Sequence, residues 1–328
     1  ALGVFVAAYA VSRPRGVRLR VPGALRSLTT TAPAAGAALA FPLYHQFFGP
    51  GSYRGLPEYT LTMGSDVASY WSFARRSIAG TAESAAALTQ NPTEENSFLG
   101  WPLLLVLGSV VVWLRREPVV RALALTGVVF TVLSLGSTPW LAGNELNIRS
   151  PWGWFDGLPI LDSVVPTRLA LVVTPVAGCL LAIAMVRYGD LQRAERGATA
   201  RQLRVLGVLA LVMALGPLTP TPLPTFERPL VPAFFAAGLY RDHVPTDGVV
   251  LGIPPGWEPA LHAMQWQTAA RLDFRIFGGY YLAPTPDDPD RTAMFGPVYP
   301  PTMELLSEVA EKDVAVEVTD ELRALAAA

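Results

Sequence analysis

Apolar stretches recur along the chain and alternate with polar stretches rich in arginine. The apolar stretches lie at residues 1–11, 28–48, 98–114, 118–136, 169–186 and 205–219. The last four come close to the roughly 20 residues that a helix needs to cross the hydrocarbon of a bilayer. Pro33 and Pro42 interrupt the second stretch, so we expect a kinked span there. The pattern predicts about six membrane spans, the first of them incomplete.

The charges between the apolar stretches indicate how the chain is oriented in the membrane. The segments 12–26, 115–121 and 187–204 carry thirteen arginines and three acidic residues, whereas the loops 49–97 and 137–168 carry five arginines and eight acidic residues. Arginine-rich loops usually face the cytoplasm. The first set should therefore lie inside, and the loops 49–97 and 137–168 should lie outside.

The character of the chain changes after the last apolar stretch. From Pro220 onward, fifteen acidic residues face six arginines and Lys312, which gives this part a net charge of −8. Strand-like and helix-like patterns alternate at 248–253, 258–270, 274–281, 303–311 and 314–318. This alternation is typical of α/β structure. We expect a transmembrane helical domain at 1–221 and a small extracytoplasmic α/β domain at 222–328.

The composition supports a membrane protein. Hydrophobic residues make up 51% of the 328 residues and charged residues only 16%, a balance unusual for a soluble protein. The chain begins at Ala1 within an apolar run and stops at Ala328 within an amphipathic pattern. We therefore expect a fragment with both ends missing and a truncated C-terminal domain.

Several common catalytic and binding motifs are absent from the sequence. There is no phosphate-binding Gly-rich loop with lysine, no paired metal-binding cysteines and no Gly-x-Ser-x-Gly motif. His45, His243 and His262 are scattered along the chain, so we expect no metal site built from them. No nucleic-acid partner is expected, and no cofactor is indicated, although a divalent cation is compatible with the outer carboxylates.

Charged residues of the two outer loops are the candidates for chemistry. A general base or metal ligand could be one of Glu58, Asp66, Glu94, Glu95, Asp156 and Asp162, with Asp66 and Glu95 named as weak catalytic candidates. Arg149 and Arg168 could hold a phosphate through two parallel hydrogen bonds. The alternative is solvated loop charge, together with an ion pair between Arg168 and Asp162.

Arg168 is the strongest of these candidates. It lies where the loop 137–168 enters the membrane, at the depth of lipid headgroups, and a cation there needs a partner. Trp152 and Trp154 lie in the same loop. They could stack on a sugar, or they could simply belong to the aromatic belt at the membrane surface.

Several short motifs resemble the C-terminal half of bacterial membrane glycosyltransferases of the GT-C type, including YfhO-like proteins. The motifs are Glu95-Asn96-Ser97-Phe98-Leu99-Gly100, Leu133-Ser134-Leu135-Gly136, Gly157-Leu158-Pro159, Val165-Pro166-Thr167-Arg168, Val249-Val250-Leu251-Gly252-Ile253-Pro254, Met264-Gln265-Trp266-Gln267-Thr268 and Gly278-Gly279-Tyr280. Of the family's Arg-x-Pro-x-Arg motif, only the second arginine is present, at Arg168.

This resemblance implies a GT-C-like fold and a function at the outer face of the bacterial cytoplasmic membrane. The implied reaction is transfer of a sugar from a polyprenyl-phosphate donor to an acceptor, with Arg168 or Arg149 offsetting charge on the departing phosphate. The family's catalytic acid usually lies in the first outer loop, which would precede Ala1. The alternatives are a transporter or flippase of lipid-linked glycans, and a non-catalytic membrane protein with an outer binding domain. The implied partners are membrane lipid and the polyprenyl-phosphate sugar.

Overall fold

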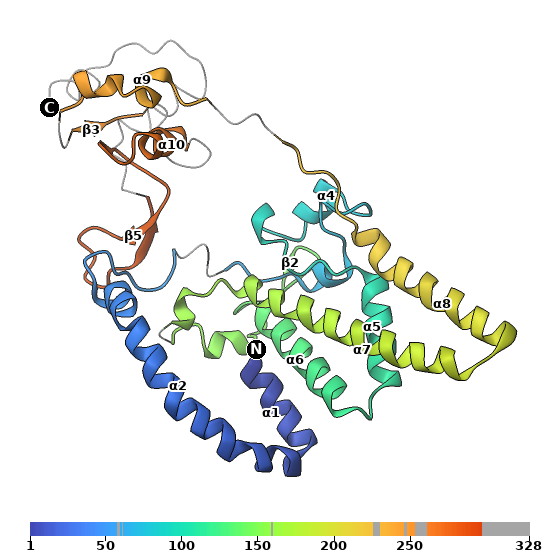
Figure 1. The fold of residues 1–328 in the computed structure, drawn as a ribbon. Helices are drawn as coiled ribbons and strands as arrows, with labels where there is room; N and C mark the ends of the chain where they lie inside the picture. Colours follow the sequence, from blue (N-terminus) through green and yellow to red (C-terminus); the bar gives the residue numbers. More distant parts are fainter. Residues whose placement is uncertain are drawn as a thin grey trace. The chain divides into compact units, whose positions relative to one another are not determined.

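The computed structural model describes residues 1–57, 60, 62–158, 160–225, 230–245, 248–252 and 261–296. The chain divides into two units. The first comprises Ala1–Phe41 and Glu58–Pro224, and the second comprises Pro42–Pro57 and Thr225–Ala328 (Figure 1). The hydropathy pattern had not indicated that Pro42–Pro57 belongs with the C-terminal part of the chain. Each unit is described separately below.

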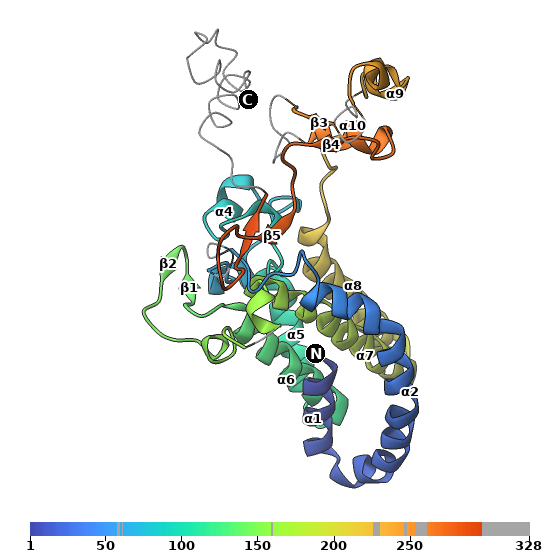
Figure 2. The same cartoon turned by 90° about the vertical axis from the view of Figure 1, so that its left-hand side faces the viewer.

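The first unit is mainly helical. Its longer helices are α1 (Leu2–Ser12), α2 (Pro14–Phe48, which continues into the second unit), α5 (Trp101–Trp113), α6 (Pro118–Ser134), α7 (Val173–Ala194) and α8 (Gly197–Leu215). α6 packs against both α1 and α7, and α5 packs against α7 and α8 (Figure 2). Helices therefore form at the four apolar stretches between residues 98 and 219, as predicted.

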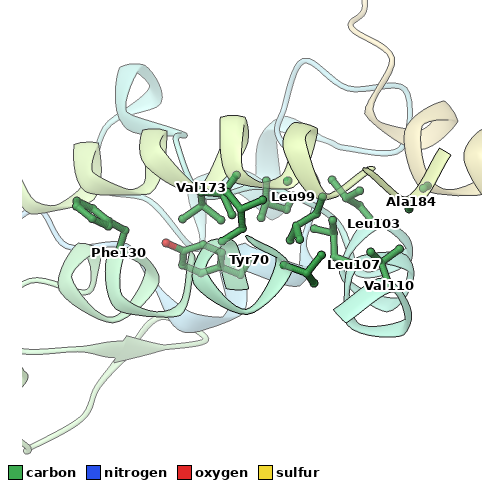
Figure 3. Packing of buried hydrophobic residues seen from close by; sticks show 14 of the residues in the cluster. Tyr70, Leu99, Leu103, Leu107, Val110, Phe130, Val173 and Ala184 are labelled. Atoms are coloured by element: carbon green, nitrogen blue, oxygen red, sulfur yellow. The ribbon is translucent and has the colours of Figure 1, made fainter. Parts of the chain in front are cut away.

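The core of this unit lies between α5, α6 and α7. Figure 3 shows Leu99, Leu103, Leu107 and Val173 in this core, with Phe130 at one end of the cluster. Tyr70, from the loop 49–97, packs into the same cluster. Since burial of apolar side chains is the main favourable contribution to packing, this contact fixes the loop to the helices.

Two helical stretches are long and apolar enough to cross a membrane. They are Pro166–Ala194, in which the 3-10 helix η5 (Pro166–Val172) leads directly into α7, and Gly197–Leu218. The other apolar helices of the described chain, α1, α5 and α6, have 11, 13 and 17 residues. α1 and α5 fall short of the roughly 20 residues that a straight span requires, and α6 lies at the lower limit of about 17. The described chain is therefore mostly helical, and two of its helical stretches are long and apolar enough to cross a bilayer.

The N-terminal arginine segment differs from the prediction. The sequence suggested a loop at 12–26 followed by a kinked span at 28–48, but α2 is one helix of 35 residues with no buried residue. Pro14 begins it, at the position where proline costs no hydrogen bond, and arginine, leucine and alanine favour helix. The segment 187–204 is likewise mostly helical, because α7 ends at Ala194 and α8 begins at Gly197.

The two predicted outer loops are ordered by short elements. These are η1 (Val67–Trp71), α4 (Ala82–Ala86), η2 (Pro92–Glu94), β1 (Trp140–Leu141), β2 (Asn144–Glu145), η3 (Pro151–Trp154) and η4 (Leu161–Ser163). β1 and β2 form an antiparallel hairpin, and Asp66 bridges to Trp140 of this hairpin. The loops 49–97 and 137–168 thus contact each other directly.

The second unit combines short strands and helices. Its described elements are α9 (Ala233–Ala236), η7 (Leu239–Asp242), β3 (Val249–Val250), α10 (His262–Ala269), β4 (Arg275–Ile276), β5 (Leu282–Pro284) and β6 (Ala293–Phe295). β3 pairs with β4 in parallel, with α10 between them along the chain, whereas β5 and β6 are antiparallel. The helix expected at 303–311 and the strand expected at 314–318 lie outside the described residues.

Candidate functional site

Arg168 is anchored by a buried carboxylate. It lies in the first turn of η5, and its Nε and Nη2 atoms donate to Oε1 of Glu94 at 2.9 and 2.5 Å. The other carboxylate oxygen, Oε2, accepts from Nδ2 of Asn96 at 2.9 Å. The Glu94 side chain is only 8% exposed, whereas that of Arg168 is 59% exposed. The guanidinium is therefore held at its base while much of it faces outward.

This arrangement corrects the partner expected for Arg168. The sequence suggested an ion pair with Asp162, six residues earlier, but the carboxylate that accepts from Arg168 belongs to Glu94, 74 residues away. Asp162 instead accepts a hydrogen bond from Ser163 at 3.1 Å. A charge-assisted contact with a buried, already ordered carboxylate is more favourable than one within an exposed turn.

Hydroxyl groups fix the backbone beneath Arg168. The hydroxyl of Thr167 lies 3.0 Å from that of Ser65 and donates to the carbonyl oxygen of Glu94 at 3.4 Å. The backbone N–H of Thr167 donates to the carbonyl of Met63 at 3.1 Å. The loops 49–97 and 137–168 therefore meet at Thr167, which orients the neighbouring arginine.

Glu95, proposed as a weak catalytic candidate, is also engaged. Its Oε2 accepts from the backbone N–H of Arg75 at 3.0 Å, and its Oε1 accepts from the Nε of the same arginine. The two side chains are 9% and 22% exposed. Consecutive glutamates thus hold one arginine each, and Glu95 serves as an anchor and is not positioned as an open general base.

Asp66, the other catalytic candidate, binds backbone groups. Oδ1 accepts from the N–H groups of Ala68 at 2.7 Å and Ala142 at 2.9 Å, and Oδ2 accepts from the N–H of Gly143 at 2.7 Å. The side chain is buried. It caps η1 and joins this 3-10 helix to the hairpin of the other loop. This geometry is that of a structural residue.

The remaining candidates, Trp152, Trp154 and Arg149, form no hydrogen bond or ion pair with Arg168 among the described contacts. Trp152 is only 4% exposed, so its ring packs inside the protein and cannot offer a face to a sugar, which corrects that prediction. Trp154 is 70% exposed and remains available for stacking. Arg149 is exposed, and no carboxylate of the described residues pairs with it.

Tyr70 is a buried titratable group of the loop 49–97. Its hydroxyl lies 2.6 Å from the hydroxyl of Ser134, and burial raises the pKa of the phenol above its ordinary value. It therefore stays neutral and acts as a hydrogen-bonded core residue. Sequence reasoning had missed this residue, and also the anchoring role of Glu94, which had been only one of six outer carboxylates.

Within the part of the chain that the structure describes, no group of three or more His, Cys, Asp or Glu side chains could hold a metal ion. The divalent cation stays a prediction. No family model matches the chain, and no curated protein or solved structure matches it either. What the site can do is therefore inferred from its own geometry.

Proposed function

We propose that the chain is part of a polytopic membrane glycosyltransferase that moves a sugar from a polyprenyl-phosphate donor to an acceptor at the outer membrane surface. The observation that carries this proposal is the anchored but exposed Arg168, at the start of the apolar helix formed by η5 and α7. A planar guanidinium is well suited to phosphate. Its placement there suits a phosphate whose lipid chain lies in the bilayer.

In this proposal, Arg168 stabilises the phosphate as negative charge builds on it during transfer. A fixed donor needs no reorganisation as the reaction proceeds, which is why preorganised groups contribute most to such steps. Glu94 is a positioning residue that holds the guanidinium. Neither Asp66 nor Glu95 is assigned as the base that deprotonates the acceptor, because both carboxylates already accept two or more hydrogen bonds.

Because the carboxylates of Asp66 and Glu95 already accept hydrogen bonds, a second candidate function is favoured. In this function the chain is a membrane protein that binds a lipid phosphate without catalysing transfer. The same Arg168 would then hold the headgroup, and no base would be required. A transporter or flippase is less favoured, because residues 169–186 contain no charged side chain of the kind that usually marks a transport pathway.

The role of Arg168 can be tested in a Glu94→Gln variant, in which the buried negative charge of Glu94 has been removed. Arg168→Ala alone leaves Glu94 without its main partner and should lower stability by about 1–2 kcal/mol, less than for a fully buried pair because Arg168 is mostly exposed. Adding Glu94→Gln should restore folded yield. In this background, sugar transfer per folded molecule should fall about 10²-fold for Arg168→Ala and less for Arg168→Lys.

The matched control is Arg76→Ala, which removes another exposed arginine of the loop 49–97. It should leave transfer unchanged. Glu94→Gln alone should keep most of the transfer activity, because the amide oxygen can still accept from the guanidinium. Wild-type activity of Glu94→Gln both with and without Arg168→Ala would remove Arg168 from the site. Should no protein show transfer while binding of a polyprenyl phosphate still depends on Arg168, the binding protein becomes the better description.

The proposed orientation predicts a labelling pattern. In a Cys179→Ser background, which removes the exposed native thiol, Asn147→Cys should react with an impermeant thiol reagent in intact cells. Ala198→Cys, between α7 and the arginines of α8, should react only after the membrane is opened. Labelling of Ala198→Cys in intact cells would reverse the orientation.

A further inference from the structure

A groove between α5, α7 and α8 lies along the C-terminal half of α7, whereas Arg168 lies before the first residue of that helix. It has a volume of about 730 Å³ and is lined mainly by apolar side chains, among them Leu105, Val110, Leu181, Ala210 and Leu211. Ser109, the one hydroxyl on its α5 side, donates to the carbonyl of Leu105 at 2.8 Å and so adds little polarity. From Leu105 to Trp113 the groove follows α5 for about 12 Å.

One end of the groove is polar and aromatic. Trp113, Tyr188, Gln192 and Arg204 lie there, close to the helix ends that join the arginine-rich segments. The rings of Trp113 and Tyr188 meet edge to face at 6.4 Å, and the Tyr188 hydroxyl donates to the carbonyl of Leu203 at 2.8 Å. Such aromatic pairs commonly lie at the depth of lipid headgroups.

Gly207 allows the polar, aromatic end of the groove to form. A Cβ atom at Gly207 would come within 2.6 Å of the Tyr188 ring, so only glycine lets the ring lie directly against α8. The ring is thereby held beside the groove, about one helical turn along α8 from Arg204. The polar end is built by packing and does not depend on a mobile loop.

The charge at this end is strongly positive. The segments 115–121 and 187–204 together carry eight arginines and three acidic residues. Glu117 is already paired with Arg187 at 2.7 Å and Asp190 with Arg193 at 2.8 Å. Among the described residues, no carboxylate pairs with Arg204. An occupant with an apolar chain and an anionic head would match both ends of the groove.

We propose that this groove binds an anionic phospholipid from the arginine-rich side of the membrane, with an acyl chain between α5, α7 and α8 and the phosphate beside Arg204. This inference rests on the membrane location given under the proposed function, but not on sugar transfer. The site is separate from Arg168, which lies at the opposite end of α7. Basic residues near a membrane surface attract anionic lipid, by about fivefold in affinity for each residue.

The test uses the full chain, purified in detergent and freed of lipid, with phosphatidylglycerol and phosphatidylcholine of identical chains as probes in native mass spectrometry. Wild-type protein should retain one phosphatidylglycerol in preference to phosphatidylcholine. Arg204→Gln should lower this preference about fivefold. Arg121→Gln, at an exposed arginine of the same membrane side that does not line the groove, should leave the preference unchanged.

A second pair of variants tests the apolar part of the groove. Ala210→Trp should fill the groove and reduce binding of both lipids, whereas Val212→Trp, exposed on α8 outside the groove, should have no effect. Equal effects within either pair would overturn the proposal. So would a lipid-free oligomer that Ala210→Trp dissociates, because a second copy would then cover the groove.

Extraction of the membranes with alkaline carbonate distinguishes failure of the proposed membrane location from failure of the proposed lipid groove alone. Release of the chain into the soluble fraction would overturn the membrane location and this inference together. An integral protein that binds phosphatidylglycerol but transfers no sugar would leave the lipid groove standing and remove only the proposed reaction. An integral protein without the lipid preference would remove only the groove.

Discussion

Replacing Asp66 with alanine is expected to lower the amount of folded protein. The carboxylate accepts hydrogen bonds from three backbone N–H groups, of Ala68, Ala142 and Gly143, and it is buried. The N–H of the buried Ala68 should cost about 1–3 kcal/mol when it is left without a partner, whereas Ala142 and Gly143 are exposed and should cost about 0.5–1.5 kcal/mol each, because water can replace the carboxylate. The total loss should be about 2–6 kcal/mol, and the upper end of this range is comparable with the whole stability of a marginal domain. Folded yield and thermal unfolding in detergent would measure it.

Two further variants make this prediction specific. Asp66→Asn keeps one acceptor oxygen but turns an N–H donor toward the N–H of Gly143, so its loss should be smaller than that of alanine. Asp162→Ala should be nearly neutral, because that carboxylate accepts only from Ser163 among the described contacts. A well-folded Asp66→Ala protein lacking activity would reverse the assignment and return Asp66 to the catalytic candidates.

Replacing Cys179 with aspartate should separate a membrane helix from a water-exposed one. Cys179 lies on the exposed face of α7, near the middle of the uncharged stretch 169–186. In a bilayer, an aspartate at this depth costs about 2.5–3.5 kcal/mol for insertion. On a helix in water, the same exposed change would cost no more than about 0.5 kcal/mol. Membrane insertion and cellular abundance would show which applies.

The controls for this variant lie on the same helix. Cys179→Leu should be tolerated, because lipid accepts an apolar side chain. Leu191→Asp should also be tolerated, since this exposed position lies beyond the apolar stretch, among the arginines. Normal abundance of Cys179→Asp would mean that this face of α7 does not contact hydrocarbon, and the proposed span would then have to be abandoned.

The helices could be predicted from the sequence where a long apolar stretch without charge dominates the pattern. The stretch 169–186 has no charge and gives α7, and the stretch 205–219 gives most of α8. The α2 segment was not predictable in the same way. Its arginines were read as a loop because charge usually marks a membrane surface, yet arginine also favours helix, and Pro14 at the first position starts one.

The candidate site was predictable only in part, because its contacts are non-local. The place of Arg168 at the edge of an apolar stretch follows from the sequence alone. Its partner Glu94 lies 74 residues away, so nothing in the local pattern could distinguish it from the other outer carboxylates. Trp152 shows the same limit, since a tryptophan beside a membrane can be exposed or buried, and packing of the loop decides which.

The bonds of Asp66 to the hairpin also impose an order on biosynthesis. The carboxylate lies 76 and 77 residues before the two hairpin N–H groups that it binds, and α5 and α6 come between them. At translation rates of about 5–20 residues per second, the hairpin follows Asp66 by several seconds. In the proposed topology, the early loop waits outside the membrane without the two hairpin donors of Asp66 until the next loop has crossed. Ribosome-bound chains ending before Gly143 should therefore expose this loop to protease.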